Sequence, residues 1–367
     1  MQTSKRAVVI HSLASGRAMQ LSQALSSLDR AGIEVIRLIE VTDLAQQPVQ
    51  GKDWAEQGVQ IAIAAGGDGV IGSVINQIAR SVLPLGIMPL GTSNDIARSL
   101  DIPLDMDDAA RTIATGHVRR IDLGAARSPG VTGTTAEAPS QDDSLLYGYF
   151  AHVLTIGLNV QFAQIATNVA TRKRYGRLTY PVAALEVLRK PEVLSVRLQF
   201  EGLRLPPYVA GQDGDSQTAN KDHVALNCRA LQVTVINAPV FGGAWHITLP
   251  GSTLDDNLLD VVVFEEGGLA RLNARLALFF NSPPLGNEKP EDEEEVGEFI
   301  HHPAELTGLL GVHHLQARGI TIATEQDPQP VTLDGEIRGH TPLYVELVEN
   351  FLPVLVPEEK KSTATQK

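Results

Sequence analysis

Residues 60–72 read QIAIAAGGDGVIG: a short apolar run, a glycine-rich turn and the start of a helical pattern. The apolar run predicts a buried strand over residues 60–64, and the apolar spacing after the turn predicts a helix over residues 70–80. The same alternation continues on both sides, which is typical of an α/β domain whose parallel strands are joined by crossover helices. The other elements expected in this domain are strands at 6–11, 34–38 and 83–88 and helices at 18–31 and 96–100.

Three turns rich in Gly, Ser and Asn follow the first, third and fourth of these strands. They should meet at the carboxyl edge of the sheet, where ligands bind in open α/β folds. Glycine lets main-chain N–H groups surround a phosphate, while Asp68 would repel one unless Mg²⁺ or water lay between them. A simpler interpretation is a set of tight turns, with Ser93 or Asn94 capping the next helix. Capping needs only one such residue, so the run from Thr92 to Asp95 favours a site.

The chain has 367 residues, of which 43% are hydrophobic and 20% charged, enough for two domains with their own cores. The single cysteine, Cys228, excludes an intrachain disulfide. No apolar stretch reaches the length of a membrane-spanning helix, and the N-terminus lacks the pattern of a signal peptide. We therefore expect a soluble, cytoplasmic protein. The formal net charge of −13 argues against binding to nucleic acid.

Much of the acidic excess lies in three expected loops, at 127–145, 205–222 and 283–298. The rest of the chain is much less acidic, so the net charge does not exclude transient contact with a membrane surface. A dense basic cluster within residues 172–177 has two interpretations. It is either a solvated helix face or a docking site for anionic lipid headgroups.

The pattern changes after residues 121–123 to strand-like runs with one helical stretch, which predicts a mostly β second domain. We expect the first domain to comprise residues 1–124 and the second residues 125–343, with residues 344–367 returning to complete the first. The strands expected in the second part of the chain are at 145–158, 193–200, 230–238, 259–265, 319–323, 329–333 and 343–348, and the helix is at 161–188.

Motifs along almost the whole chain resemble those of the diacylglycerol kinase catalytic-domain family, which includes sphingosine and ceramide kinases and a group of soluble bacterial lipid kinases. The most specific are residues 89–97, PLGTSNDIA, and the late Asp334-Gly335-Glu336. Agreement of so many ordered motifs by chance is very improbable. The other matches are Ser15-Gly16-Arg17, Gly66-Gly67-Asp68-Gly69, Asn76, Ile121-Asp122-Leu123, Gly157-Leu158, residues 175–180, Gly242-Gly243, Pro250 and residues 256–261.

The resemblance implies a doubly wound α/β nucleotide domain followed by a β-sandwich domain, with the active site in the cleft between them. It implies a kinase that uses ATP and Mg²⁺ to phosphorylate the hydroxyl of diacylglycerol or a related lipid alcohol. By the same resemblance Glu336 is the general base, in a catalytic turn with Asp334. The residues assigned to the nucleotide are Ser12, Ser15, Gly16, Arg17, Gly66, Gly67, Asp68, Gly69, Val70, Ile71, Gly72, Gly91, Thr92, Ser93 and Asn94.

Metal ligands are also implied by the resemblance, in two groups. The residues alone allow simpler interpretations: 255–257 as an ordinary turn, and Asp334-Gly335 as the turn of a type I′ hairpin. Such a hairpin would aim Glu336 at the cleft. The first implied group is a water and Mg²⁺ network of Asp68, Asp95 and Asp122, and the second is a structural Mg²⁺ site of Asp256 with the carbonyls of Thr253 and Leu258.

Three departures from the family pattern bear on activity. Ser12-Leu13 stands in place of Asn-Pro, Val70 in place of a threonine, and Gly72-Ser73 in place of Asn-Glu. The changes at 70 and 73 remove polar groups expected near the nucleotide. Two alternatives therefore stay open: an NAD kinase, which shares the GGDG turn, and a catalytically weak nucleotide- or lipid-binding module. The resemblance implies a lipid partner met by transient contact at the inner membrane face, and the sequence leaves a homodimer open.

Overall fold

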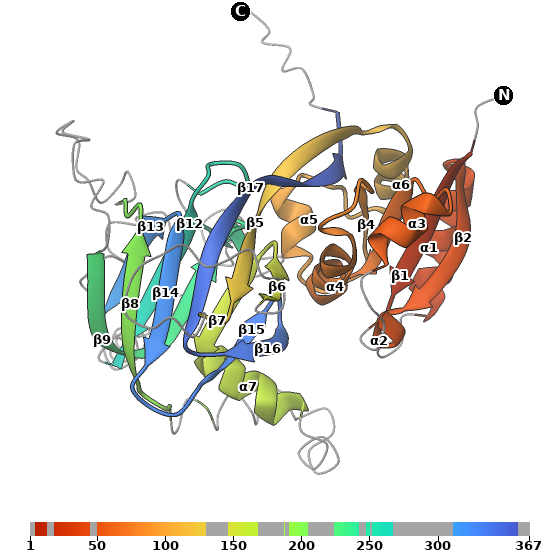
Figure 1. Ribbon diagram of the computed structural model, residues 1–367. Coiled ribbons are helices and arrows are strands. Elements are labelled where there is room, and N and C mark those ends of the chain that lie inside the picture. Colours follow the sequence, from red (N-terminus) through yellow and green to blue (C-terminus); the bar gives the residue numbers. More distant parts are fainter. Residues whose placement is uncertain are drawn as a thin grey trace, which may run out of the picture.

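The computed structural model consists of an α/β domain and a β-rich domain that lie side by side (Figure 1). No helix among the described residues has the length and apolar character needed to cross a membrane. The residues that the structure describes are 4–12, 18–44, 50–129, 146–167, 187, 191–204, 224–241, 247–249, 252–266 and 311–358.

The α/β domain is built on a parallel sheet in the order β17-β4-β3-β1-β2, in which β17 (Leu343–Val356) comes from the end of the described chain. Its inner strands are continuous apolar runs because helices cover both faces. In β1, Val8 and Ile10 join the core formed with α3 and α4, whereas Ala7 and Val9 join the core formed with α1 and α6. The elements are β1 (Lys5–His11), α1 (Ala18–Arg30), β2 (Ile33–Glu40), α2 (Val41–Leu44), α3 (Gly51–Glu56), β3 (Ile61–Gly66), α4 (Asp68–Ile78), β4 (Leu85–Pro89), α5 (Asp95–Ser99) and α6 (Met106–Thr115).

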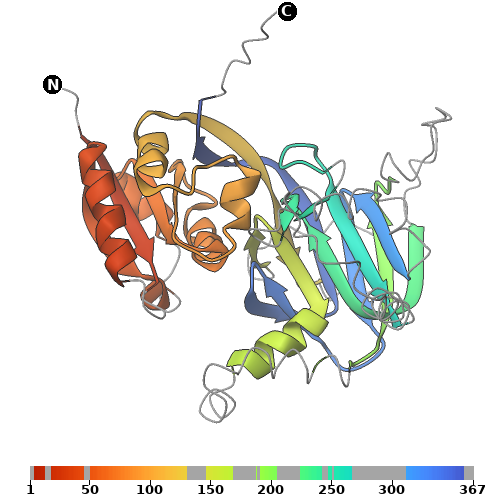
Figure 2. The ribbon, with the colours of Figure 1, turned by 180° about the vertical axis from the view of Figure 1, so that it is seen from behind.

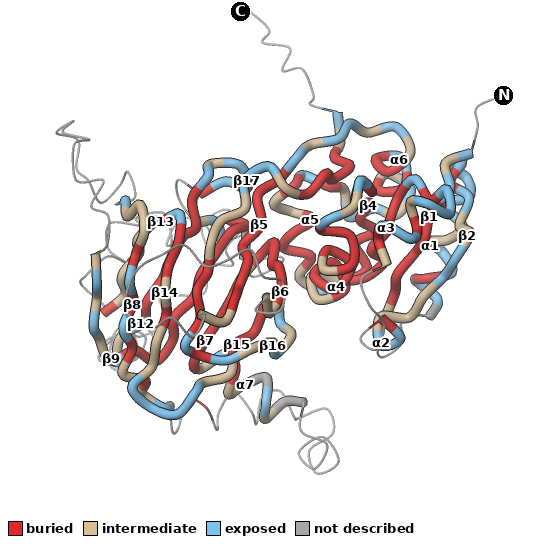
Figure 3. Tube along the Cα trace, viewed as in Figure 1, coloured by how far each residue is buried: buried red, intermediate tan, exposed pale blue. Residues whose placement is uncertain are grey.

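The β-rich domain is antiparallel, with strands in the order β16-β15-β7-β9-β8-β14-β17 and with β12 paired to both β9 and β13. Alternate residues of these strands face one shared core, which includes Phe200, Val233 and Val261. Figure 3 shows buried residues running through the central strands of both domains. The elements are β5 (His117–Arg127), β6 (Leu146–Phe150), β7 (Val153–Gly157), α7 (Leu158–Thr167), β8 (Leu194–Glu201), β9 (Val224–Ile236), β10 (Val240–Phe241), β11 (Ile247–Thr248), β12 (Leu259–Glu265), β13 (Val312–Ala317), β14 (Gly319–Thr324), β15 (Pro330–Leu333), β16 (Glu336–His340) and β17 (Leu343–Val356).

Two long strands, β5 and β17, run from one domain into the other (Figure 1 and Figure 2). At one end of β17, Leu343 pairs with Ile322 of β14 in the β-rich domain, and at the other end Val354 pairs with Leu85 of β4 in the α/β domain. The register between β5 and β17 shifts between Val348 and Leu352. The last described strand therefore joins the strands of both domains into one continuous sheet.

The expected α/β architecture followed by a β-sandwich domain is confirmed, although several elements differ from those expected. The run expected as one strand at 145–158 is broken at residues 151–152, because main-chain groups there bind the turn after β15. The strand expected at 343–348 continues to Val356, and β13 carries no alternating pattern that predicts a strand. The basic cluster at 172–177 and most of the three acidic loops lie outside the described residues.

Candidate active site

The turns that follow β3 and β4 touch each other through their glycines. A Cβ on Gly91 would lie 2.4 Å from the Cα of Gly67, and one on Gly67 would lie 3.1 Å from the Cα of Gly91. Neither position can carry a side chain without moving the other turn. The two turns predicted from sequence to share an edge are thus packed directly together.

Asn94 shapes the second turn from within. It adopts the left-handed conformation, with φ of 54°, and is buried. Its Oδ1 accepts the N–H of Gly91 at 2.8 Å, and its Nδ2 donates to the carbonyl of Gly91 at 3.0 Å. The simpler interpretation, in which the Asn94 side chain caps α5, does not hold, because its amide oxygen is directed back into its own turn and makes no cap hydrogen bond to the helix.

The cap of α5 is instead supplied by Asp68, from the other turn. The Oδ1 of Asp68 accepts the N–H of Ile96 at 2.9 Å. This contact orients the carboxylate toward a helix N-terminus, which favours its negative charge. Asp95, the first residue of α5, is itself buried, while Thr92 is exposed at the tip of the turn.

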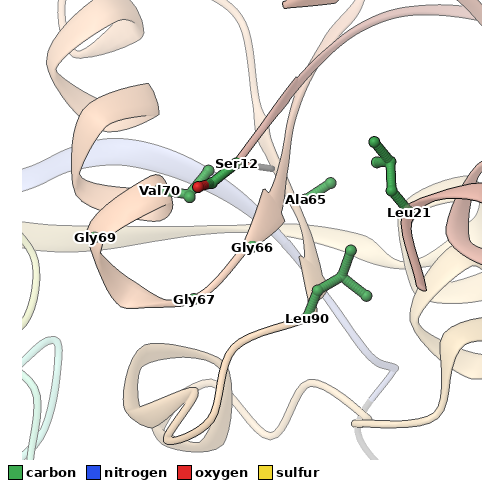
Figure 4. Close-up of a pocket in the computed structure, with 8 residues that line it drawn as sticks. All are labelled: Ser12, Leu21, Ala65, Gly66, Gly67, Gly69, Val70 and Leu90. Carbon is green, nitrogen blue, oxygen red and sulfur yellow. The ribbon is translucent and has the colours of Figure 1, made fainter. Parts of the chain in front are cut away.

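A cavity of about 190 Å³ opens beside the first of these turns, at the end of β3 (Figure 4). The first N–H groups of α4 have no acceptor within the helix, and Gly67 at its N-cap has no side chain to bind them. Common ligand pockets have volumes of roughly 300–1,000 Å³. This cavity is smaller, so it fits a phosphate group better than a whole nucleotide. Its lining residues are Ser12, Leu21, Ala65, Gly66, Gly67, Gly69, Val70 and Leu90.

The cavity lining brings together only part of the predicted nucleotide set. Ser12, Gly66, Gly67, Gly69 and Val70 line it. Other members of the set lie elsewhere. Ile71 is buried in the domain core, Gly72 contacts Asp334, and the β4–α5 turn residues Gly91, Thr92, Ser93 and Asn94 are not in the lining, while Ser15, Gly16 and Arg17 lie outside the described residues.

The predicted hairpin at the end of β15 is confirmed. Leu333 pairs with Glu336, which leaves a two-residue turn with positive φ at both Asp334 (46°) and Gly335 (86°), as a type I′ turn requires. Asp334 anchors this turn, because its buried carboxylate accepts hydrogen bonds from the main chain between β6 and β7. Burial raises the pKa of Asp334, and these hydrogen bonds oppose that shift. The three donors are the N–H groups of Ala151 (2.9 Å), His152 (3.0 Å) and Val153 (2.9 Å).

Glu336, the first residue after the turn, connects the two domains. Its Oε1 accepts the hydroxyl of Ser73 in α4 at 2.6 Å. Its Oε2 accepts the guanidinium of Arg338 at 2.6 Å from Nη2 and 3.0 Å from Nε. Ser73, where the family pattern has a carboxylate near the nucleotide, lines a pocket other than the small cavity at the end of β3. Arg338 was missed, although its place two residues after Glu336 on one strand puts both side chains on one face.

That second pocket has a volume of about 590 Å³ and lies between α4 and the β6 and β16 strands. Asn76 of α4 fixes one wall, since its Nδ2 donates to the carbonyl of Tyr149 at 2.9 Å and its Oδ1 accepts the N–H of Tyr149 at 2.8 Å. The lining combines apolar side chains with polar and charged ones. The lining residues are Val41, Leu44, Ser73, Asn76, Gln77, Ala79, Arg80, Leu146, Tyr147, Gly148, Tyr149, Glu336 and Arg338.

The acidic residues assigned to metal sites form no group of three or more ligating side chains within the described part of the chain. Asp122 is buried, and its two oxygens accept the N–H groups of Asn350 (2.7 Å) and Asn257 (3.2 Å). Asp256 accepts the N–H groups of Thr253 (2.9 Å) and Leu258 (3.0 Å) within its own turn. A metal at either place would therefore rely on main-chain oxygen or water beside one carboxylate.

The charge balance around Asp256 nevertheless fits a cation. Burial, with a smaller contribution from the nearby charges of Asp260 and Asp122, raises the pKa of Asp256 to about 6. The hydrogen bonds from Thr253 and Leu258 oppose this shift. A divalent cation would offset the unfavourable negative charge, and each carboxylate oxygen keeps a lone pair beyond its bond to N–H.

Comparison with known proteins matches both domains of the chain. Residues 6–126 match the diacylglycerol kinase catalytic domain, and residues 152–283 match the YegS C-terminal NAD kinase beta sandwich-like domain. The chain is 24% identical over 365 residues to a diacylglycerol kinase of Staphylococcus saprophyticus, covering 98% of this chain and 97% of that protein. It is 22% identical over 364 residues to one from Staphylococcus carnosus, with coverage of 98% and 97%.

A solved structure from Bacillus anthracis shares the fold, with a TM-score of 0.59, 21% identity and coverage of 97% of both chains. The α/β domain, the β-sandwich and these matches define the protein as a lipid kinase of the two-domain type. Its first domain matches the diacylglycerol kinase catalytic-domain family, as its motifs indicate.

Proposed function

We propose that this protein transfers the γ-phosphoryl group of ATP, with Mg²⁺, to the hydroxyl of diacylglycerol or a related lipid alcohol. The position of α4 carries the proposal. Its first turn borders the 190 Å³ cavity, and its next turn contacts Glu336 in the 590 Å³ pocket. A phosphate at the helix N-terminus and a hydroxyl beside Glu336 would be aligned by one rigid element, which is the main requirement of phosphoryl transfer.

The lining of the larger pocket supports a lipid alcohol as acceptor. Val41, Leu44 and Leu146 provide an apolar wall, and Asn76 and Glu336 provide polar groups. Such a pocket suits a molecule with an apolar body and a hydroxyl head. The relatives named diacylglycerol kinase support the same substrate class. Because such an acceptor resides in a membrane, we also infer transient peripheral contact with a membrane surface.

In the proposed reaction the acceptor oxygen forms a bond to the γ-phosphorus of ATP, and the bond to the β–γ bridging oxygen breaks to release ADP. Glu336 accepts the hydroxyl proton as a general base. Gly67, Gly69 and the first N–H groups of α4 hold phosphate oxygens. Mg²⁺ would supply neutralising charge for the phosphates, held by Asp68 and Asp95, and a second ion would be held by Asp256.

Incubation with γ-labelled ATP, Mg²⁺ and a total lipid extract, followed by separation of the products, tests this function. We expect label in a phosphorylated lipid, and loss of that product in Glu336→Gln. Soluble NAD in a parallel reaction tests the NAD kinase alternative. ATP binding without any labelled product would instead support the catalytically weak binding module and refute the proposal.

A further inference from the structure

The hydroxyl of Ser73 has two acceptors within reach. Its Oγ lies 2.6 Å from Oε1 of Glu336 and 3.0 Å from the carbonyl oxygen of Gly69, one turn earlier in α4. A serine hydroxyl carries a single proton, so it donates to only one of these oxygens at a time. Ser73 is buried, with 7% of its surface exposed, which favours a protein partner over water.

The other carboxylate oxygen of Glu336 has a donor that cannot reverse its role. Arg338 contacts Oε2 through Nη2 and Nε, and a guanidinium only donates hydrogen bonds. A proton placed on Oε2 would face these N–H groups. The carboxylic acid form of Glu336 therefore carries its proton on Oε1, the oxygen that faces Ser73.

We propose that Ser73 is a positioning residue that reverses its hydrogen bond when Glu336 gains a proton. This rests on the proposed function, in which Glu336 takes the proton of the acceptor hydroxyl. Before transfer, Ser73 donates to the Glu336 carboxylate. After transfer, Oε1 of Glu336 donates to the Ser73 oxygen, and Ser73 turns its own proton to the Gly69 carbonyl. No proton is lost or gained by Ser73, and both forms of Glu336 keep a partner.

The identity of residue 73 follows from this role. The position needs a side chain that both donates and accepts, which a hydroxyl does and an aliphatic group does not. Threonine keeps the hydroxyl and can also reach the carbonyl four residues earlier in a helix. Valine has nearly the shape of threonine without the hydroxyl. Ser73→Thr and Ser73→Val are therefore a matched pair.

The test measures kcat and KM with ATP, Mg²⁺ and dioleoylglycerol in mixed micelles, and with total lipid extract, for the parent, Ser73→Val and Ser73→Thr. We expect kcat of Ser73→Val to fall about tenfold or more, since a hydrogen bond to a charged group is lost, with KM for ATP within about twofold of the parent. Ser73→Thr should keep most of the parent kcat. Ser73→Ala gives the same comparison with a smaller side chain should Ser73→Val unfold at a lower temperature.

A second comparison separates this role from a purely structural one. In a Glu336→Gln background the proton acceptor is absent, so the residual rates of the Ser73→Val and Ser73→Thr double variants should be equal. If Glu336→Gln is inactive but Ser73→Val and Ser73→Thr have equal kcat values, the inference is overturned. The proposed function would still stand. An active Glu336→Gln protein would overturn the assignment of Glu336 and the inference together. A parent protein that phosphorylates no lipid would overturn the proposed function itself.

Discussion

Gly72 of α4 is in direct contact with Asp334 of the β15–β16 turn. A Cβ on Gly72 would lie 2.9 Å from the Cβ of Asp334 and 3.1 Å from its Oδ2. Asp334 cannot move away easily, because its carboxylate is held by three consecutive N–H groups. The helix of one domain and the catalytic turn of the other are thus packed without space for a methyl group.

This contact predicts that Gly72→Ala destabilises the protein, although alanine in a helix interior normally stabilises by up to about 1 kcal/mol. Gly69→Ala in the same helix is the matched control, since its Cβ would meet only the Asp334 carbonyl at 3.8 Å, an ordinary contact. Chemical denaturation measures both free energies of unfolding. We expect opposite signs, with Gly72→Ala losing about 1–3 kcal/mol. Equal effects would mean that the two domains do not pack as described.

Val70 lines the small cavity, at the position where the family pattern has the hydroxyl of a threonine. We expect Val70→Thr to lower the KM for ATP by up to about tenfold with little change in kcat, because one hydrogen bond to a bound phosphate is worth about 1 kcal/mol. Val74→Thr, one turn later and fully buried in the core, is the control. It should lower stability and leave ATP affinity unchanged. Unchanged ATP binding in Val70→Thr would argue against a nucleotide in this cavity.

Two substitutions separate the structural role of Asp68 from its chemical role. Asp68→Asn keeps an oxygen to accept the N–H of Ile96, whereas Asp68→Ala loses this cap and about 1 kcal/mol of stability. We expect Asp68→Asn to unfold near the parent temperature but to lose at least about 100-fold in kcat, because it lacks the charge assigned to the Mg²⁺ network. Calorimetry and steady-state kinetics measure the two effects. Full activity in Asp68→Asn would restrict this residue to capping.

The raised pKa of Asp256 predicts that the response of the Tm to Mg²⁺ depends on pH. Its pKa is raised from 3.8 to about 6, so in the absence of metal its contribution to stability is present below about pH 4 and is lost as the pH rises through 6. At pH 7.5 Mg²⁺ should raise the Tm, and this increase should disappear as the pH falls through about 6, where protons compete with the metal. Asp256→Asn should abolish the increase at every pH.

Asp255→Asn is the control for this experiment, since Asp255 points to Arg119 at 2.7 Å and is partly exposed. It should keep the full response of the Tm to Mg²⁺. A response that survives in Asp256→Asn would place the ion elsewhere.

The parts of the fold that local patterns determine could be predicted from the sequence. The β3–α4 turn follows from an apolar run and glycines, and the β15–β16 hairpin follows from Asp334-Gly335, because only certain residues accept positive φ. The Asp334-Gly335 turn also predicted that Glu336 faces the other domain, where it contacts Ser73. Those features depend on residues close together in the chain.

The contacts that orient the candidate site could not be predicted in this way. Ser73 and Glu336 are 263 positions apart, and Asp68 caps a helix that begins after a different strand. Residue type alone left open a capping role for Asn94, which the structure does not show. The packing of one turn on another decides which partner a polar side chain meets.

The path of β17 has a consequence for synthesis of the protein on the ribosome. The strand that completes the α/β sheet beside β4 is encoded at residues 343–356, after the other strands of the β-rich domain. While the chain emerges, β4 keeps an open edge, and such edges pair readily with other chains. The nascent α/β domain must therefore wait for nearly the entire polypeptide before its sheet closes, so neither half of this protein matures independently of the other.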